Sequence, residues 1–156
     1  MPTKFDDFFA RLLKREGGYS NDPDDKGGRT IYGVSERAHP ELWRYGPPTL
    51  PQARALYERV YFKGPGFDRI PFLPLQEQLF DFAVNSGPKR AIRTLQRIVG
   101  TTPDGVLGPK TLAAILVQGV SRTNNLLVKE RVKFLSRQTC KFVPGLVSRA
   151  LEFLIP

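Results

Sequence analysis

Apolar residues recur every three or four positions along most of the 156-residue chain, which is the spacing of helices that bury one face. In the first stretch, Thr3 and Asp6 have the form of a capping box, so we expect a helix to begin there and to end at Gly17-Gly18. The apolar stripe of this helix consists of Phe5, Phe8, Phe9, Leu12 and Leu13.

Proline and glycine, with 14 residues each, divide the remaining chain into short elements. Most of these elements keep the helical period, so the pattern predicts a mainly α-helical fold without an internal repeat. Further helices are predicted from Thr49 to a break at Gly64, from Pro71 or Pro74 to Asn85, around 91–99, from Thr111, over 123–138 and after Pro144.

Residues 19–35 are the exception, because no helical period runs through them. They are rich in turn-forming residues, and this composition predicts a small β-hairpin. We expect its arms near Tyr19-Ser20 and Thr30–Val34, with Asn21–Gly28 between them.

The charge of the chain is unevenly distributed. The chain has 24 basic and 15 acidic side chains and a net charge of +9, but residues 79–156 hold 12 of the basic and only 4 of the acidic ones. Such an excess favours a polyanionic partner, which could be nucleic acid, an anionic envelope polymer or a membrane surface. We therefore expect a segment 1–86 that carries the chemistry and a basic helical segment 87–156, packed together as one globular unit.

Composition also argues against several classes of protein. The longest apolar run, Leu112–Val117, is far too short to span a membrane. Asp6 and Asp7 interrupt the first apolar stretch, which argues against a secretory signal. Because Cys140 is the only cysteine and His39 the only histidine, an internal disulfide is excluded and a His-rich metal site or a His-dependent triad is disfavoured. We expect neither metal nor cofactor.

The best candidate for chemistry is the acidic turn after the first helix. Glu16 ends this helix, where the negative end of the helix dipole disfavours a carboxylate and raises its pKa, as a general acid requires. Burial against Tyr19 and Tyr32 would add to this effect, whereas Lys14 and Arg15 would oppose it.

Asp25 follows Glu16 nine residues later, with Asp22 and Asp24 as alternatives. A glutamic acid that faces an aspartate is the arrangement that cleaves glycosidic bonds, because one carboxyl protonates the leaving oxygen while the other supports the nucleophile or the developing charge. Thr30 could orient a water or the aspartate by hydrogen bonding. The alternative is that this cluster of Asp, Asn and Pro is only a turn.

A basic face accompanies two of the predicted helices. A polyanion could bind it, although the alternative is a face that is simply solvated. The residues of this face are Lys89, Arg90, Arg93, Arg97, Lys129, Arg131, Lys133, Arg137 and Lys141.

A series of short motifs extends from the acidic turn toward residue 118. It consists of Glu16-Gly17-Gly18-Tyr19, Asn21-Asp22-Pro23, Asp25, Gly27-Gly28, Thr30, Tyr32-Gly33-Val34-Ser35, Phe80–Pro88, Ala91-Ile92, Leu95-Gln96 and Asp104–Thr111. Together these motifs resemble the glycoside hydrolase family 108 muramidases, which include phage endolysins and muramidases that assist toxin secretion. The last motif resembles the predicted peptidoglycan-binding region that commonly follows the catalytic segment.

The resemblance implies a lysozyme-like fold, with two helical lobes and a short β-hairpin near residues 19–35 beside the active-site cleft. It implies cleavage of the β-1,4 bond between N-acetylmuramic acid and N-acetylglucosamine, with Glu16 as the general acid. The nine-residue step from Glu16 to Asp25, followed by Thr30, also resembles the Glu–Asp–Thr order of phage lysozymes, which implies that Asp25 and Thr30 are further catalytic residues. The candidate substrate contacts are Tyr19, Asp22, Tyr32, Asn85 and Gln96.

Two positions depart from the family pattern. Many relatives have Trp where this chain has Phe62, and a Gly-Trp pair where it has Gly145-Leu146. The loss of these rings would weaken sugar stacking or change the packing. Trp43 and Tyr45 lie in a loop-like stretch, and we expect them to be better candidates for a sugar-binding wall than aromatics at helical spacing.

Two other functions fit parts of the pattern. A non-catalytic cell-wall binding module would explain the basic half but not the paired carboxylates, and a nucleic-acid-binding protein would be expected to carry a recognisable motif, which the chain lacks. We expect a monomer whose partner is the peptidoglycan glycan strand, with outer-membrane lipopolysaccharide as a second anionic candidate for the basic half. Without a secretory signal, such a protein would be made in the bacterial cytoplasm and would reach the periplasm or wall through a holin or a secretion machinery.

Overall fold

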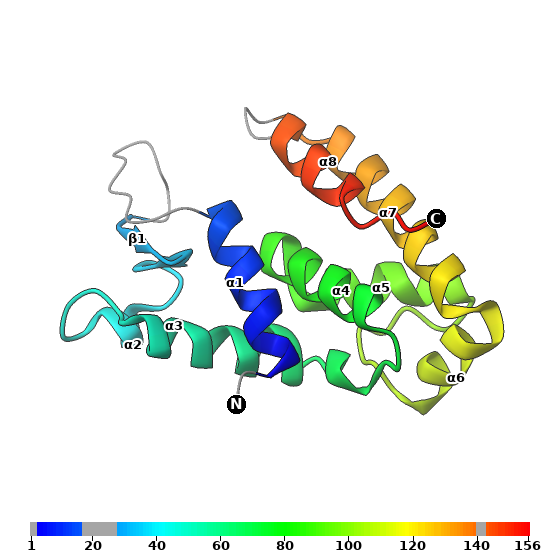
Figure 1. Ribbon diagram of the computed structural model, residues 1–156, viewed down its shortest axis with the longest axis horizontal. Coiled ribbons are helices and arrows are strands. Elements are labelled where there is room, and N and C mark those ends of the chain that lie inside the picture. Colours follow the sequence, from blue (N-terminus) through cyan, green and yellow to red (C-terminus); the bar gives the residue numbers. More distant parts are fainter. Residues whose placement is uncertain (1–2, 17–27, 140–142) are drawn as a thin grey trace. The chain divides into compact units, whose positions relative to one another are not determined.

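Helices dominate this computed structural model, which describes residues 3–16, 28–139 and 143–156 (Figure 1). The chain divides into two compact units, Met1–Val60 and Tyr61–Pro156. The elements are α1 (Lys4–Glu16), β1 (Thr30–Ile31), β2 (Val34–Ser35), α2 (Pro40–Trp43), α3 (Leu50–Tyr57), the π-helix η1 (Glu58–Lys63), the 3-10 helix η2 (Phe67–Arg69), α4 (Leu73–Ser86), α5 (Pro88–Val99), α6 (Pro109–Gln118), α7 (Val120–Ser136) and α8 (Val143–Leu151).

A charged cluster joins the start of α1 to α3 in the first unit. The backbone N–H of Thr3 donates to the Asp6 carboxylate, as the predicted capping box requires, and the Thr3 hydroxyl donates to it at 2.9 Å. Arg54 of α3 donates to the same carboxylate and, at 2.8 Å, to Glu58, while its guanidinium lies 5.3 Å from the ring of Phe5. The hydrogen bonds from Arg54 and then from Thr3 lower the pKa of Asp6 to about 2.

The predicted helix from Thr49 is also confirmed. Thr49 and Gln52 form a complete capping box, in which each side chain bonds to the backbone N–H of the other residue. The helix continues through η1 and stops at the predicted break, Gly64. Tyr57 packs against Phe9 of α1 with 5.6 Å between ring centroids, so the apolar stripes of the two helices meet inside the first unit.

The hairpin is present, but its pairing differs from the prediction. β1 and β2 are antiparallel, with Thr30 opposite Ser35 and Ile31 opposite Val34. The two turn residues, Tyr32 and Gly33, both have positive φ (52° and 75°), which is the signature of a type I′ turn. The expectation that Thr30–Val34 forms a single arm was therefore wrong, because the chain reverses within it.

The other predicted arm, Tyr19-Ser20, lies outside the described residues. The sheet that the structure describes is therefore formed entirely by residues 30–35.

The second unit is a bundle of packed helices. α4 packs against α5 and α7, α7 also packs against α8, and α6 packs against α5 and α7. Figure 1 shows α8 lying along α7. The predicted boundary between residues 86 and 87 falls within this unit, between α4 and α5, whereas the two compact units divide after Val60.

A buried ion cluster lies at the meeting point of α4, α7 and α8. The carboxylate of Asp81 is 2.7 Å from Arg131 Nη2 through one oxygen and 2.7 Å from Arg149 Nε through the other. The Arg131 guanidinium also lies 5.0 Å from the ring of Phe82 and 5.4 Å from that of Phe153. Asp81 and Arg131 are each 1% exposed, so this cluster belongs to the core of the second unit.

Asparagine side chains of α7 hold the segment that follows α8. Asn124 donates to the carbonyl of Phe153 at 2.7 Å. Asn125 donates to the carbonyl of Ile155 at 2.8 Å and accepts from its N–H at 3.1 Å. These bonds satisfy backbone groups that no helix pairs.

Candidate active site

The first helix ends where the sequence predicts. α1 stops at Glu16, so the backbone places this residue at the C-terminus of the helix. The side chain of Glu16 lies outside the described part of the chain, and so do Tyr19, Asp22 and Asp25. Among the described residues, no group of three His, Cys, Asp or Glu side chains could hold a metal ion, and no helix is long and apolar enough to cross a membrane.

The hairpin that follows places two more of the predicted site residues in the same unit. Thr30 begins β1, and its hydroxyl donates a long hydrogen bond of 3.4 Å to the carbonyl of Gly28. Tyr32 occupies the turn with φ +52°, a conformation that L-residues other than Gly, Asn and Asp rarely adopt. Both side chains are half-buried.

An ion pair that the sequence analysis did not anticipate fastens the base of the hairpin. Arg29 Nε and Nη2 donate to the two carboxylate oxygens of Glu36 at 2.9 and 2.7 Å, and the Arg29 carbonyl accepts from the Glu36 N–H at 2.8 Å. The guanidinium of Arg29 lowers the pKa of Glu36. In the sequence, Arg29 and Glu36 are opposite charges that lie just outside the two strands. They become neighbours only when Thr30 pairs with Ser35, a register that the sequence did not predict.

The aromatic residues expected in a sugar-binding wall differ in exposure. Trp43 is 5% exposed, and its ring faces the guanidinium of Arg29 at 5.1 Å, so it belongs to the core of the first unit. The prediction that Trp43 lines a wall was wrong because α2 (Pro40–Trp43) turns this stretch inward. Tyr45 is 93% exposed and stays a candidate for sugar stacking.

Asn85 lies one residue before the end of α4. It is half-buried, and its Nδ2 donates to Asp81 at 3.4 Å. Since Asp81 is also held by two arginines, the amide of Asn85 stands next to a fixed, buried carboxylate. A contact between Asn85 and the substrate stays a prediction.

Gln96 has a structural role that explains its position better than the predicted substrate contact. It is 1% exposed, and its Nε2 donates to Asp104 at 2.7 Å and to the Val106 carbonyl at 2.9 Å. Its Oε1 accepts from the Gly105 N–H at 2.9 Å. This side chain thus holds the Asp-Gly loop together, and its hydrogen bond lowers the pKa of Asp104. A residue so buried and so fully bonded is not available to a glycan.

The described residues are mainly helical, and a short hairpin follows a helix that reaches Glu16, as expected for a lysozyme-like glycoside hydrolase. Comparison with known proteins gives the family. The family described as Glycosyl hydrolase 108 matches residues 9–87, which are about half of the chain. The chain therefore belongs to this family.

A solved structure agrees along the whole length. The structure of Brucella abortus SagA has a TM-score of 0.80 and 31% identity, with 97% of this chain and 96% of that chain covered. No curated protein gave a significant match. The fold is therefore lysozyme-like, and the family and the SagA match together support a peptidoglycan hydrolase.

The matched residues include most of the predicted site. Residues 9–87 contain Glu16, Asp25, Thr30, Tyr32 and Asn85. They stop before Gln96 and before the 104–111 motif, so a binding region there is not part of the family match.

Proposed function

We propose that the protein cleaves the β-1,4 glycosidic bond between N-acetylmuramic acid and N-acetylglucosamine in peptidoglycan, with Glu16 as the general acid. The observation that carries the proposal is the end of α1 at Glu16, followed along the chain by the two-stranded hairpin, all within the residues that match the family. A helix C-terminus favours the protonated form of a carboxyl group, which is the form that donates a proton to a leaving oxygen.

In the proposed reaction, Glu16 transfers its proton to the glycosidic oxygen as the bond to the anomeric carbon breaks. Asp25, with Asp22 as the alternative, stabilises the positive charge that develops on the sugar ring or activates the nucleophile. Water supplies the hydroxyl group to the anomeric carbon, and its remaining proton restores the acid. Thr30 Oγ1 donates toward Gly28, so its lone pairs stay available to accept a hydrogen bond from a water.

The first experiment replaces Glu16 with Gln and measures new reducing ends released from purified sacculi. We expect the rate to fall at least about a hundredfold, because general acid catalysis typically contributes a factor of 10² to 10⁴. The matched control is Glu41→Gln, which makes the same change of side chain at an exposed residue of the same unit and should leave the rate within about twofold of wild type. A Glu16→Gln variant as fast as wild type would refute the assignment of the acid.

The same assay separates an enzyme from a non-catalytic cell-wall binding module. A binding module would pellet with sacculi, release no reducing ends and bind equally well after Glu16→Gln. Comparison of Asp22→Asn, Asp24→Asn and Asp25→Asn then ranks the possible partners of Glu16, and we expect Asp25→Asn to lose the most activity.

The cleaved bond is identified by mass spectrometry of sacculus digests made in heavy-oxygen water. We expect the heavy oxygen at the reducing end of N-acetylmuramic acid. Heavy oxygen on N-acetylglucosamine would mean that a different glycosidic bond is cut.

A muramidase of this kind has to reach the cell wall. We propose that a holin or a secretion machinery releases it into the periplasm, as phage endolysins and secretion-associated muramidases require. Lysis by the pure protein of cells with a permeabilised outer membrane, and not of intact cells, supports this order of events.

A further inference from the structure

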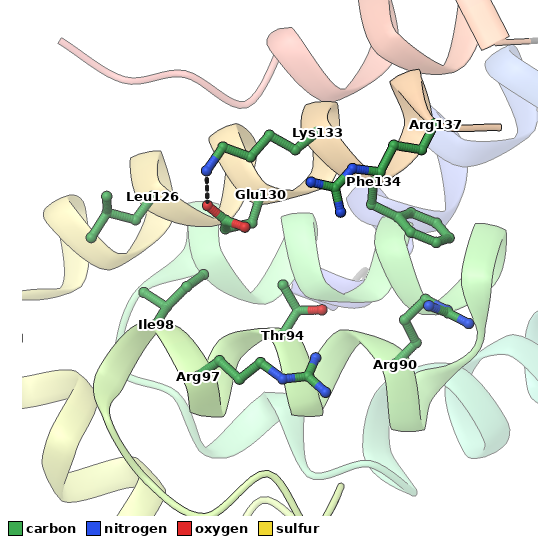
Figure 2. Close-up of a pocket in the computed structure, with 9 residues that line it drawn as sticks. All are labelled: Arg90, Thr94, Arg97, Ile98, Leu126, Glu130, Lys133, Phe134 and Arg137. Atoms are coloured by element: carbon green, nitrogen blue, oxygen red, sulfur yellow. Dashed lines mark hydrogen bonds and ion pairs between the residues drawn. The ribbon is translucent and has the colours of Figure 1, made fainter.

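A groove runs between α5 and α7 in the second unit. Its volume is about 550 Å³, which is in the range of sites that hold small molecules or short peptides. Figure 2 shows side chains of the two helices on opposite sides of it. Its lining consists of Arg90, Thr94, Arg97 and Ile98 from α5 and of Leu126, Glu130, Lys133, Phe134 and Arg137 from α7.

The groove is cationic but contains one carboxylate. Within the described residues, Arg90, Arg97 and Arg137 form no ion pair, so their guanidinium groups are available to an anion. Lys133 lies 2.8 Å from Glu130, the acidic residue of the lining. This pair is exposed and therefore weak, so a ligand can replace either partner.

The two ends of the groove differ in polarity. At one end, the Arg90 guanidinium lies 4.5 Å from the ring of Phe134, and Arg137 is on the same side (Figure 2). At the other end, Ile98 and Leu126 face each other and are half-buried. A ligand that fits has charged groups at one end and small apolar groups at the other.

A second hollow adjoins the first along α5. Its volume is about 520 Å³, and it shares Arg90 and Arg97 with the groove. It adds Lys89 and Arg93 and contains no acidic residue in its lining. The cationic surface is therefore larger than a single small anion would need.

We propose that the α5–α7 groove binds the acidic stem peptides of peptidoglycan, an inference that rests on the proposed function for the choice of polymer. Stem peptides are short, carry more carboxylates than amines and contain alanine methyl groups. The arginines match the carboxylates, Glu130 matches the amine of a diamino acid, and Ile98 with Leu126 accommodates the methyl groups. Binding there would hold the enzyme on its polymer through a part of the substrate that is not cleaved.

Glu130 favours a peptide over the other anionic candidates. A phosphate group of a lipid or of nucleic acid gains nothing from a carboxylate in the groove and is repelled by it. A ligand with both charge signs, and an excess of negative ones, complements four cations and one anion.

The direct test is calorimetric titration of the full chain with a glycan-free stem tetrapeptide that contains a diamino acid and has its N-terminal amine acetylated, so that the amine of the diamino acid is its only free one. Replacing Arg90 and Arg137 together with Glu should weaken binding at least about tenfold, because it removes the arginines nearest the aromatic end. The control is Arg122→Glu with Lys129→Glu, two exposed residues of α7 outside the lining that produce the same change in net charge. If both double variants lost the same affinity for the peptide, net charge alone would explain the loss, and the proposal would be overturned.

If the reversed variant does not fold, as judged by circular dichroism, Arg90→Gln with Arg137→Gln takes its place, and we expect a loss of about fivefold or more. Unchanged peptide binding in that variant would also overturn the proposal.

Glu130→Gln distinguishes the candidate ligands. It should weaken binding of the tetrapeptide but not of the same peptide with the amine of its diamino acid acetylated. Tighter binding of both peptides would mean that Glu130 does not recognise the amine, and groove-dependent binding to vesicles of phosphatidylglycerol in place of the peptide would mean that the groove is a phosphate or lipid site. Either result would overturn the proposal.

The two proposals can fail separately. The titration uses a peptide without sugar, so it reports on the groove even if sacculi are not cut at the predicted bond. Conversely, the release of reducing ends tests Glu16 whether or not the groove binds peptides.

Discussion

Tyr32 is an unexpected residue for its place in the chain. The turn between β1 and β2 requires positive φ at both central positions, where Asn and Gly are favoured, yet the first position holds a tyrosine at φ +52°. A left-handed conformation costs a residue with a Cβ about 1 kcal/mol or more. Such strain at the edge of a site is consistent with a ring that serves the substrate.

We predict that Tyr32→Asn raises the free energy of unfolding by about 1 kcal/mol, because Asn tolerates this φ, and lowers the rate of sacculus hydrolysis. Thermal unfolding and the release of reducing ends measure the two effects. Tyr32→Phe is the control, since it keeps the ring and the strain and should change stability little. A loss of stability in Tyr32→Asn would instead mean that the ring is held for packing.

The structural role of Asp81 depends on its buried carboxylate. Its carboxylate pairs with Arg131 through one oxygen and with Arg149 through the other. We predict that Asp81→Asn lowers the free energy of unfolding by about 3 to 5 kcal/mol, because it removes the buried carboxylate that both arginines bond. Denaturant titration measures this loss. The exposed Asp68→Asn serves as the control, and a difference below about 1 kcal/mol between the two variants would refute the structural role.

At the scale of elements, the first unit depends on the Asp6–Arg54 contact that joins α1 to α3. The pKa of Asp6 is about 2 in the folded protein, against about 4 in an unfolded chain. The contribution of this carboxylate to stability is therefore complete above about pH 4 and is lost as the pH falls through about 2.

We predict that Asp6→Asn destabilises the protein at pH 6 and that the difference from wild type shrinks between pH 4 and pH 2. Denaturant titrations at a series of pH values measure it. Asp7→Asn, which changes the exposed neighbouring carboxylate, should show no such convergence. A difference that stays constant down to pH 2 would mean that Asp6 acts without its charge.

Local signals predicted most of the helices, because each depends on residues a few positions apart. Thr49 with Gln52 forms the box that starts α3, and the end of α1 is also where the sequence places it. The register of the hairpin was missed because Tyr is a poor predictor of positive φ. For Asp81, the ion partners lie 50 and 68 residues away, and no local pattern could indicate them.

The predicted site also divides into features with a local signal in the sequence and features that depend on distant contacts. Residue type and spacing indicated the carboxylates and Thr30, but burial depends on the whole unit. Gln96 and Trp43 are residues that commonly contact sugars, and both are taken up by the core through contacts with loops and side chains elsewhere in the chain. Chemistry-bearing residue types are therefore visible in the sequence, whereas their accessibility is not.

At the scale of the whole molecule, charge separates the two units. Residues 1–60 hold 10 basic and 9 acidic side chains, whereas residues 61–156 hold 14 basic and 6 acidic ones. The near-neutral unit contains Glu16 and the hairpin, and the cationic unit contains the α5–α7 groove. We infer that long-range attraction to an anionic wall acts mainly through the second unit.

We predict that raising the salt concentration from about 50 to about 300 mM slows hydrolysis of sacculi steeply and slows that of a small soluble glycan far less, since salt screens attraction to a polyanion. Reducing-end assays on both substrates measure this ratio. The double reversal Arg122→Glu with Lys129→Glu should reduce the salt dependence through net charge alone. If hydrolysis of both substrates depended equally on salt, salt would act on the first unit, which contains Glu16, and not on attraction of the second unit to the polymer.

The ion cluster around Asp81 also sets an order for folding during synthesis. The contacts of Asp6, Arg54, Phe9 and Tyr57 are complete once the first 60 residues have left the ribosome. Asp81, by contrast, has to wait for Arg149, which is translated near the end of the chain. Until its last helix emerges, the nascent second unit has the Asp81–Arg131 pair but lacks the bond from Arg149 to the other carboxylate oxygen, which makes slow translation or early termination in this region a hazard for its folding yield.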